Sequence, residues 1–212
     1  LGANDETVNG LQQTGGSLSG STGTLSSTTA FDMRGGTADA ILGGTAGLTA
    51  SVGTSTLSKA NTYTGTTTVS GGILNVSGSL ASTGSLVVSG GTLDLQTKHQ
   101  QFAGVQQTSG TIQNGTVTLN AGNYDLQGGT VSAALAGSAG ANVTVGTTTL
   151  SGTTANTFAG LTTVSSGTLN LNKTAGVEAV AGNLTMPSGA VTLLAANQIN
   201  NAANVVVSGG TL

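Results

Sequence analysis

The chain has 212 residues, including 36 glycines, no cysteine, four basic residues and seven acidic residues. Charged residues make up 5% of it, against about 25% in an ordinary soluble domain. A net charge of −3 with so few lysines and arginines excludes a basic nucleic-acid-binding stripe and a polybasic membrane anchor. No run of about 18 apolar residues occurs, so we expect no helix that inserts into a membrane.

A short pattern recurs along the chain, with alternating residues on both sides of a glycine-rich corner. The clearest copy is Thr66–Val76, TTTVSGGILNV, and related copies occupy residues 86–95 and 205–212. The last small residue of the corner recurs at Gly16, Gly36, Gly53, Gly72, Gly91, Gly110, Gly129, Gly146, Gly167, Gly189 and Gly210. A period of about 19 residues predicts a solenoid, in which each repeat forms one coil that stacks on its neighbours.

Apolar residues keep a fixed register to these glycines. They occupy nine of eleven positions five residues before the glycine, nine of eleven positions three residues before it, and nine of eleven positions two residues after it. The exceptions are Thr67, Thr162, Gln13, Gln107, Ser55 and Thr148. Alternation held in register over eleven periods indicates strands with one dry face, and it argues against the disorder that the Gly/Ser/Thr-rich composition would otherwise suggest.

These features predict an all-β fold, a right-handed three-sided parallel β-helix of about eleven coils with about 19 residues in each. A coil of that length fits three short strands and three turns, and parallel crossovers are nearly always right-handed. The scarcity of charge fits this arrangement, because like charges stacked roughly 4.8 Å apart repel one another. Val69, Val88, Leu126 and Val164 should therefore point into a continuous core.

A larger repeat is superimposed on the coils. Matching segments, offset by 93 to 95 residues, are Leu11–Leu18 with Val105–Ile112, Phe31–Thr37 with Tyr124–Thr130, Ser51–Leu57 with Thr144–Leu150, and Asn61–Gly65 with Asn156–Gly160. A five-coil block thus occurs slightly more than twice. We expect residues 1–212 to be a single β-helix segment of a longer chain, with a loop at Thr174–Val180 and a corner at Pro187.

The stretch Leu57–Leu74, LSKANTYTGTTTVSGGIL, resembles the autotransporter-associated β-strand repeat of bacterial passenger domains. The second copy, Leu150–Leu169, departs from it at Phe158, Ala159 and Ser166. The resemblance implies a right-handed β-helix outside a Gram-negative cell, exported across the outer membrane. It also implies a stalk or scaffold that carries no catalytic residues.

Paired carboxylates, as a polysaccharide-cleaving enzyme would need, are not expected from the coil spacing. Asp32 and Asp125 hold matching outward positions five coils apart, roughly 24 Å, and Asp39 and Asp94 lie three coils apart, roughly 14 Å. Glycosidases need their two carboxyl groups within about 5 to 9.5 Å of each other. Neither pair can therefore act on one bond.

Asp32 and Asp39 flank a single corner with Arg34 between them, which makes this set the best remaining catalytic candidate. The alternative interpretation is a solvated ion pair on the coil surface. The corresponding residues of the second block are Asp125, Gln127 and Ser132. Since the internal copy lacks the same set, we favour the ion pair.

Three other groups of residues are candidates for a binding site: a histidine, a row of threonines and the aromatic residues. His99, beside Lys98, has no second histidine or cysteine to complete a metal-ligand set. A row of threonines follows the corner glycine and raises an ice-binding hypothesis, but the row beside it is too broken; its members are Thr37, Thr54, Thr92, Thr111, Thr130, Thr147, Thr168 and Thr211. The aromatic residues are interpreted as core or corner fillers, with a carbohydrate-stacking platform as the alternative; they are Phe31, Tyr63, Phe102, Tyr124 and Phe158.

The sequence thus favours a non-enzymatic scaffold or adhesin at the bacterial surface or outside the cell, without catalytic, cofactor-binding or metal-ligating residues. A self-assembling filament or biofilm-matrix protein is the first alternative, and a carbohydrate-active β-helix enzyme is the second. The expected partners are further β-helical coils of the same or identical chains, stacked end to end, and surfaces or glycans of a host or neighbouring cell. Nucleic acid is not expected as a partner.

Overall fold

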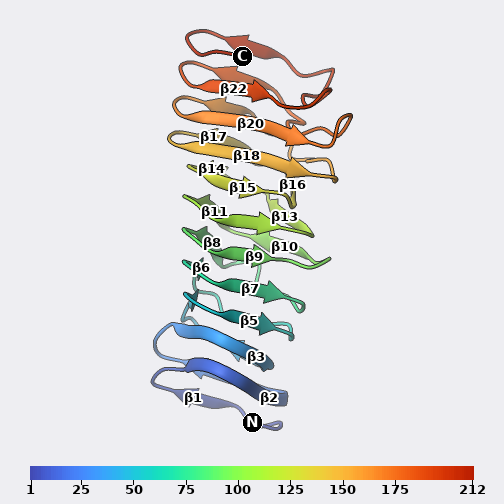
Figure 1. Cartoon of the computed structure of the whole chain (residues 1–212). Helices are drawn as coiled ribbons and strands as arrows, with labels where there is room; N and C mark the ends of the chain where they lie inside the picture. The colour runs from blue at the N-terminus through green and yellow to red at the C-terminus, as the bar shows by residue number, and fades with distance from the viewer.

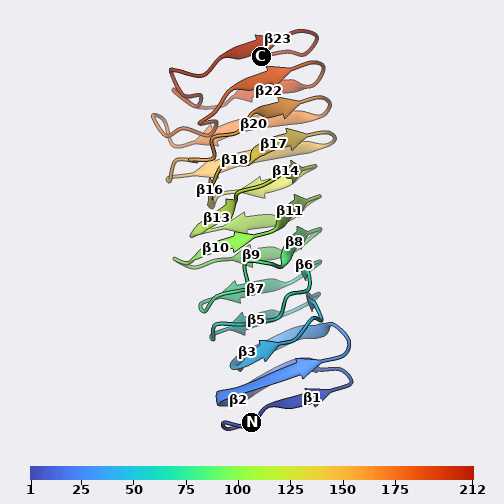
Figure 2. The ribbon, with the colours of Figure 1, turned by 180° about the vertical axis from the view of Figure 1, so that it is seen from behind.

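A computed structural model describes all residues 1–212 as a stack of coils built from strands and turns, with no helix. The two termini lie at opposite ends of the stack (Figure 1). Strands β5 (Thr54–Leu57), β7 (Ile73–Val76) and β9 (Thr92–Asp94) run left to right across the near side while the chain climbs. From behind, the strands of the other wall also run left to right (Figure 2). The winding is therefore right-handed, as predicted.

The first side of the solenoid is a parallel ladder that runs the whole length of the stack. Thr67 pairs with Leu86 and Val69 with Val88, so partners in neighbouring coils lie 19 residues apart here. Its separate strands are β4 (Leu48–Ala50), β6 (Thr67–Val69), β8 (Ser85–Val88), β11 (Gly104–Gln107), β14 (Asn123–Leu126), β17 (Gly140–Val143), β19 (Thr162–Val164), β21 (Leu184–Met186) and β23 (Val205–Val207).

The second side is a parallel ladder that follows the glycine corners. Besides β5, β7 and β9 it contains β12 (Thr111–Gln113), β15 (Gly129–Val131), β18 (Thr147–Gly152), β20 (Thr168–Lys173) and β22 (Ala190–Leu193). In the first two coils, β2 (Gln12–Ser27) and β3 (Phe31–Gly43) continue through the corners as single long strands that pair with irregular register. The fold predicted from the sequence is confirmed.

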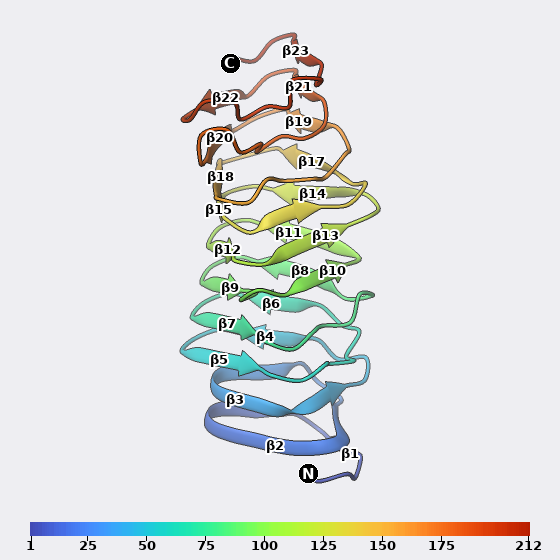
Figure 3. The same cartoon turned by 90° about the vertical axis from the view of Figure 1, so that its right-hand side faces the viewer.

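The third side is regular only in the middle of the stack. There β10 (His99–Phe102), β13 (Thr116–Leu119) and β16 (Ala134–Ala136) form a separate three-stranded parallel sheet, visible in Figure 3. At the start, β1 (Glu6–Val8) pairs with the end of β2. The other coils cross this side as turns and irregular segments, including the stretch 174–180, where we expected a loop.

The core is one column of apolar side chains along the axis. Val69, Val88, Leu126 and Val164 are all buried, as the alternation predicted, and they belong to a single cluster of 40 buried residues. The six polar exceptions to the pattern are buried as well, so they keep the register while placing polar atoms inside. Since the structure contains strands and turns only, it offers no helix that could span a membrane.

The corner glycines are required by the backbone. Nine of the eleven have positive φ, a conformation that glycine adopts at little cost. At Gly72, with φ of 62°, a β-carbon would lie 2.3 Å from the Gly53 carbonyl oxygen of the coil below. Each corner thus needs a residue with positive φ and no side chain between stacked backbones, which explains why glycine recurs with the period of the coils.

Candidate functional site

The side chain of Asn61 substitutes for a backbone carbonyl on the irregular third side. Its Oδ1 accepts the buried N–H of Leu42 from the coil below at 3.0 Å, and its Nδ2 donates to the Lys59 carbonyl at 2.9 Å. The Leu42 carbonyl is satisfied by the backbone N–H groups of Thr62 and Tyr63. Asn61 therefore closes a ladder that the backbone alone leaves incomplete.

The second block repeats this device at Asn156. Its Oδ1 accepts the Leu135 N–H at 2.9 Å, and its Nδ2 donates to the Ala179 carbonyl of the coil above at 2.7 Å. Gln100 and Gln198 are also buried, and each accepts a backbone N–H from the coil below. Sequence reasoning did not assign these amides a role, although the recurrence of Asn61 at Asn156 was a signal that could have revealed it.

The two blocks differ in one buried hydrogen bond. The Tyr63 hydroxyl lies 2.8 Å from Thr67 Oγ1, and burial raises the pKa of Tyr63 well above its ordinary value. In the second block Phe158 replaces the tyrosine, and Thr162 Oγ1 is buried without a partner. Thr67 and Thr162 thus occupy equivalent buried positions, but only the Thr67 hydroxyl has a hydrogen-bond partner.

Asp32 belongs to the polar surface of the first side. It accepts hydrogen bonds from Gln12 Nε2 at 2.7 Å and from Arg34 Nε at 2.9 Å. Asp125 accepts the same two contacts in the second block, from Gln106 and Gln127. Each carboxylate thus makes one contact to the coil below and one within its own coil, and a glutamine can take the place of the arginine in the second contact.

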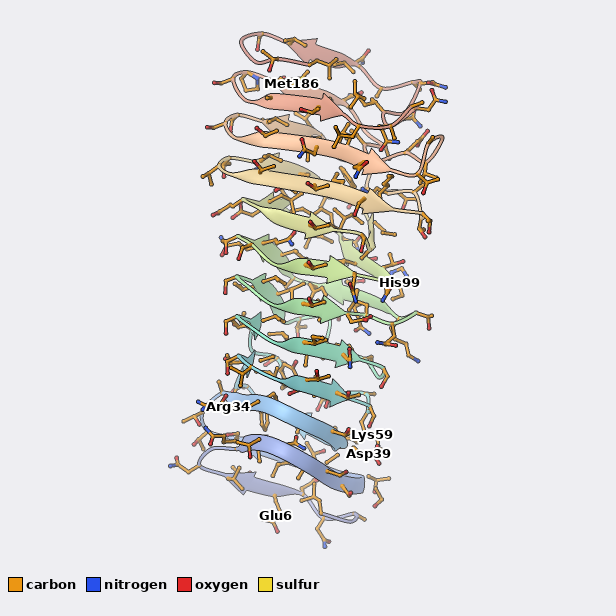
Figure 4. The ribbon with its side chains drawn as sticks, viewed as in Figure 1. Glu6, Arg34, Asp39, Lys59, His99 and Met186 are labelled. Carbon is orange, nitrogen blue, oxygen red and sulfur yellow. The ribbon has the colours of Figure 1, made fainter.

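Asp39 does not join Asp32 in a common site. Figure 4 shows Arg34 and Asp39 at opposite edges of the solenoid. Asp39 Oδ1 accepts from the Ser58 hydroxyl at 2.6 Å and lies 3.6 Å from Lys59 Nζ. The Ser58 hydrogen bond, followed by the charge of Lys59, lowers the pKa of Asp39. The candidate set of Asp32, Arg34 and Asp39 is therefore wrong as a site, because the corner separates the two carboxylates.

The other residues weighed from the sequence also take structural positions. His99 is exposed on β10, and its ring contacts Thr118 of the next coil at 2.5 Å. All five aromatic residues are buried, with Phe31 against Tyr63 and Tyr124 against Phe158 in tilted pairs, so the core interpretation is confirmed and the stacking platform is wrong.

The threonine row follows the outer face of the second side. Ile73 and Ala190 interrupt it, and Ile73 is 39% exposed. Polar residues of the neighbouring row bond along the axis, as in the contact of Asn170 Nδ2 with Thr149 Oγ1 at 3.5 Å. A broken row beside self-bonded polar groups does not form the flat, uniform array that ice binding would require.

Lys173 is a buried cation that the sequence reasoning did not single out. It ends β20 at an inward position of the alternation, and its Nζ donates to the Ser151 carbonyl at 2.8 Å. No carboxylate pairs with it. Burial lowers the pKa of Lys173 to about 8.

One recess is present on the surface, and we name it the polar notch. It has a volume of about 340 Å³ and lies where the second side turns into the third side. In Figure 1 this edge steps inward between the loop after β9 and the loop after β18. The side chains that line it are Gln96, Thr97, Asn114, Ser132, Thr153 and Thr154.

Asp94 lies beside the polar notch and holds two lining residues, Gln96 and Asn114, in place. Its carboxylate accepts from Asn114 Nδ2 at 2.8 Å, from the Gln96 N–H at 2.7 Å and from Gln113 Nε2 at 2.9 Å. Burial raises the pKa of Asp94, but the hydrogen bonds from Asn114, Gln113 and Gln96 outweigh burial and leave the pKa lowered. Asp94 is therefore ionised at neutral pH.

These features define the class of the protein: a right-handed parallel β-solenoid whose polar groups mostly serve contacts between coils. A family model of the passenger-associated-transport-repeat matches residues 51–76 and 145–171, the two stretches that contain Asn61 and Asn156. No curated protein and no solved structure gives a match.

The chain thus carries two passenger-associated-transport-repeats within a parallel β-solenoid, which confirms the resemblance to an autotransporter passenger β-helix. The matched stretches cover about a quarter of the chain, as 26 and 27 of its 212 residues. Together the repeats and the fold support an autotransporter passenger domain. The family is one of structural passenger repeats.

Proposed function

We propose that the chain is a non-enzymatic β-helical stalk of an exported bacterial surface protein, which holds other parts of that protein at a distance from the cell. The observation that carries the proposal is the unbroken first-side ladder, from β2 to β23, which couples every coil to the next. A continuous ladder of this kind gives a rod whose coils depend on their neighbours for stability.

The polar chemistry of the surface supports a structural role. The carboxylates most suited to catalysis, Asp32, Asp39 and Asp125, each accept hydrogen bonds from residues of neighbouring coils. The Asn61 and Asn156 amides, which lie within the matched repeats, complete the backbone ladder. The features that the passenger repeat contributes therefore explain stacking.

Removal of one five-coil block tests the stalk. Deletion of residues 62–156 in the full protein joins Asn61 to Thr157, and the register is kept because Asn61 and Asn156 make equivalent contacts. The rod should shorten by roughly 24 Å, five coils at strand spacing. We expect the shortened protein to reach the cell surface and to show the shorter length by small-angle scattering.

A deletion of residues 62–146 serves as the control, because it joins positions that differ in register. This control should fail to fold or to reach the surface. Loss of display in the in-register deletion would overturn the stalk proposal. Turnover of a polysaccharide that disappears in Asp32→Asn or Asp39→Asn would instead support the carbohydrate-active enzyme.

A further inference from the structure

We propose that the polar notch binds a short neutral saccharide. The inference adds a ligand to the scaffold and does not depend on the stalk function. It starts from the recess itself, because the rest of the described surface contains no comparable cavity.

The shape of the polar notch follows from unequal corners. Two residues join β12 to β13, and two join β15 to β16, whereas four separate β9 from β10 and a longer loop follows β18. Gly115 allows the corner after β12 to lie close against the coil below. Its φ is 54°, and a β-carbon there would lie 2.2 Å from the Lys98 carbonyl oxygen. The two tight corners form the floor of the recess, and the loops on either side form its walls.

The lining selects for a neutral, hydrophilic ligand. It contains amides and hydroxyls and no apolar side chain, so it lacks the apolar contacts that a lipid or an aromatic ligand would need. No cationic side chain lines it, and the ionised Asp94 lies beside it, so a phosphate or an acidic sugar would be disfavoured. Hydroxyl and amide groups both donate and accept, which matches the paired donors and acceptors of sugar hydroxyls.

The Asn114 side-chain amide and the Gln96 backbone are held in fixed positions in the lining. Gln96 and Asn114 have φ of 56° and 58°, and they are two of the three non-glycine residues with positive φ. Asp94 anchors the Gln96 backbone and the Asn114 Nδ2, which leaves Asn114 Oδ1 free to accept from a ligand. Strained backbone held by its surroundings is a feature of preorganised ligand sites.

The hydroxyls of the lining are free to bind. Thr97, Ser132, Thr153 and Thr154 make no side-chain hydrogen bond within the protein, whereas nearby Gln113 is bonded to Asp94. All aromatic residues are buried in the core, so no ring is offered for stacking. Because binding then rests on hydrogen bonds that water also makes, we expect a Kd on the order of 1 mM.

Saturation-transfer difference NMR on the 212-residue chain tests the proposal, with cellobiose and N,N′-diacetylchitobiose as neutral probes and glucuronic acid as the acidic probe. At least one neutral probe should receive saturation, and glucuronic acid should receive none. The double variant Thr153→Val, Thr154→Val removes two hydroxyls at nearly constant volume and should weaken binding about fivefold or more, which corresponds to one or two lost hydrogen bonds.

Thr54→Val, at an exposed position of β5 outside the polar notch, is the matched control and should bind like the parent. Melting curves of the three proteins should coincide, which shows that the fold is retained. No saturation of either neutral probe, or equal saturation in the double variant, would overturn the inference. Either result leaves the stalk proposal intact, because the block deletion tests that proposal separately.

Discussion

The buried amide of Asn61 gives the sharpest prediction about stability. Asn61→Ala removes the only side-chain acceptor of the Leu42 N–H and the donor to the Lys59 and Ser79 carbonyls. Asn61 is 3% exposed, so water cannot readily replace these contacts. The change should therefore weaken the stacking of the second and third coils.

The magnitude follows from the orphaned donor. A buried N–H left without a partner costs about 1–3 kcal/mol. We take about 2 kcal/mol as the local loss, which corresponds to roughly 30-fold faster opening of that part of the coil.

Native-state hydrogen exchange is the suitable assay, because it reports local opening in a protein whose coils need not unfold together. The Leu42 amide should exchange roughly 30-fold faster in Asn61→Ala. Asn156→Ala should affect the Leu135 amide in the same way, and Asn172→Ala, at an exposed position, should change neither. Unchanged protection of Leu42 would refute the role assigned to Asn61.

Three further predictions concern the core, the corners and pH. Phe158→Tyr should give the buried Thr162 hydroxyl a partner and stabilise the coil by about 1 kcal/mol, and an unchanged melting temperature would count against it. Gly72→Ala should destabilise by about 2–4 kcal/mol in urea unfolding, whereas Gly15→Ala, where no atom lies within 4 Å, should be nearly neutral; equal losses would contradict the corner geometry. Burial lowers the pKa of Lys173 to about 8, so between about pH 8 and about pH 9.5 the unfolded chain binds more protons and stability should rise with pH; Lys173→Met should remove the rise, and a fall in the parent would contradict it.

The regular part of the fold could be predicted because it depends on a local rule. An inward side chain in one coil stacks on its equivalent in the next, so positions such as Val69 and Val88 must both be apolar. The exceptions keep the inward position but not the apolar character, as Thr67 shows, which is buried and hydrogen-bonded to Tyr63. The period, the corners and the apolar register therefore follow from the sequence.

The third side could not be predicted in the same way. Most coils there lack alternation, and a polar residue such as Asn61 looks like a surface residue until its backbone partner Leu42 is known. The separation of Asp39 from Asp32 and its partner Arg34 was also missed, because closeness in sequence across a corner does not imply that two side chains meet.

The polar notch is beyond sequence reasoning for a related reason. It depends on how the tight corner at Asn114 compares with the wider loops of coils before and after it. Such differences between coils have no signal within any single repeat. The glycine at position 115 marks a turn, but it does not reveal that the neighbouring coils protrude.

The central claim, that coils far apart in sequence stack as successive rungs, is tested most directly by distances between spin labels along the first side. Thr163→Cys would be paired in turn with Thr68→Cys, Thr49→Cys and Asp32→Cys, outward positions five, six and seven coils away. Electron–electron distances should rise from roughly 24 Å to roughly 29 Å and roughly 34 Å, one strand spacing for each coil. Distances that do not increase by this constant step would contradict the stacked solenoid.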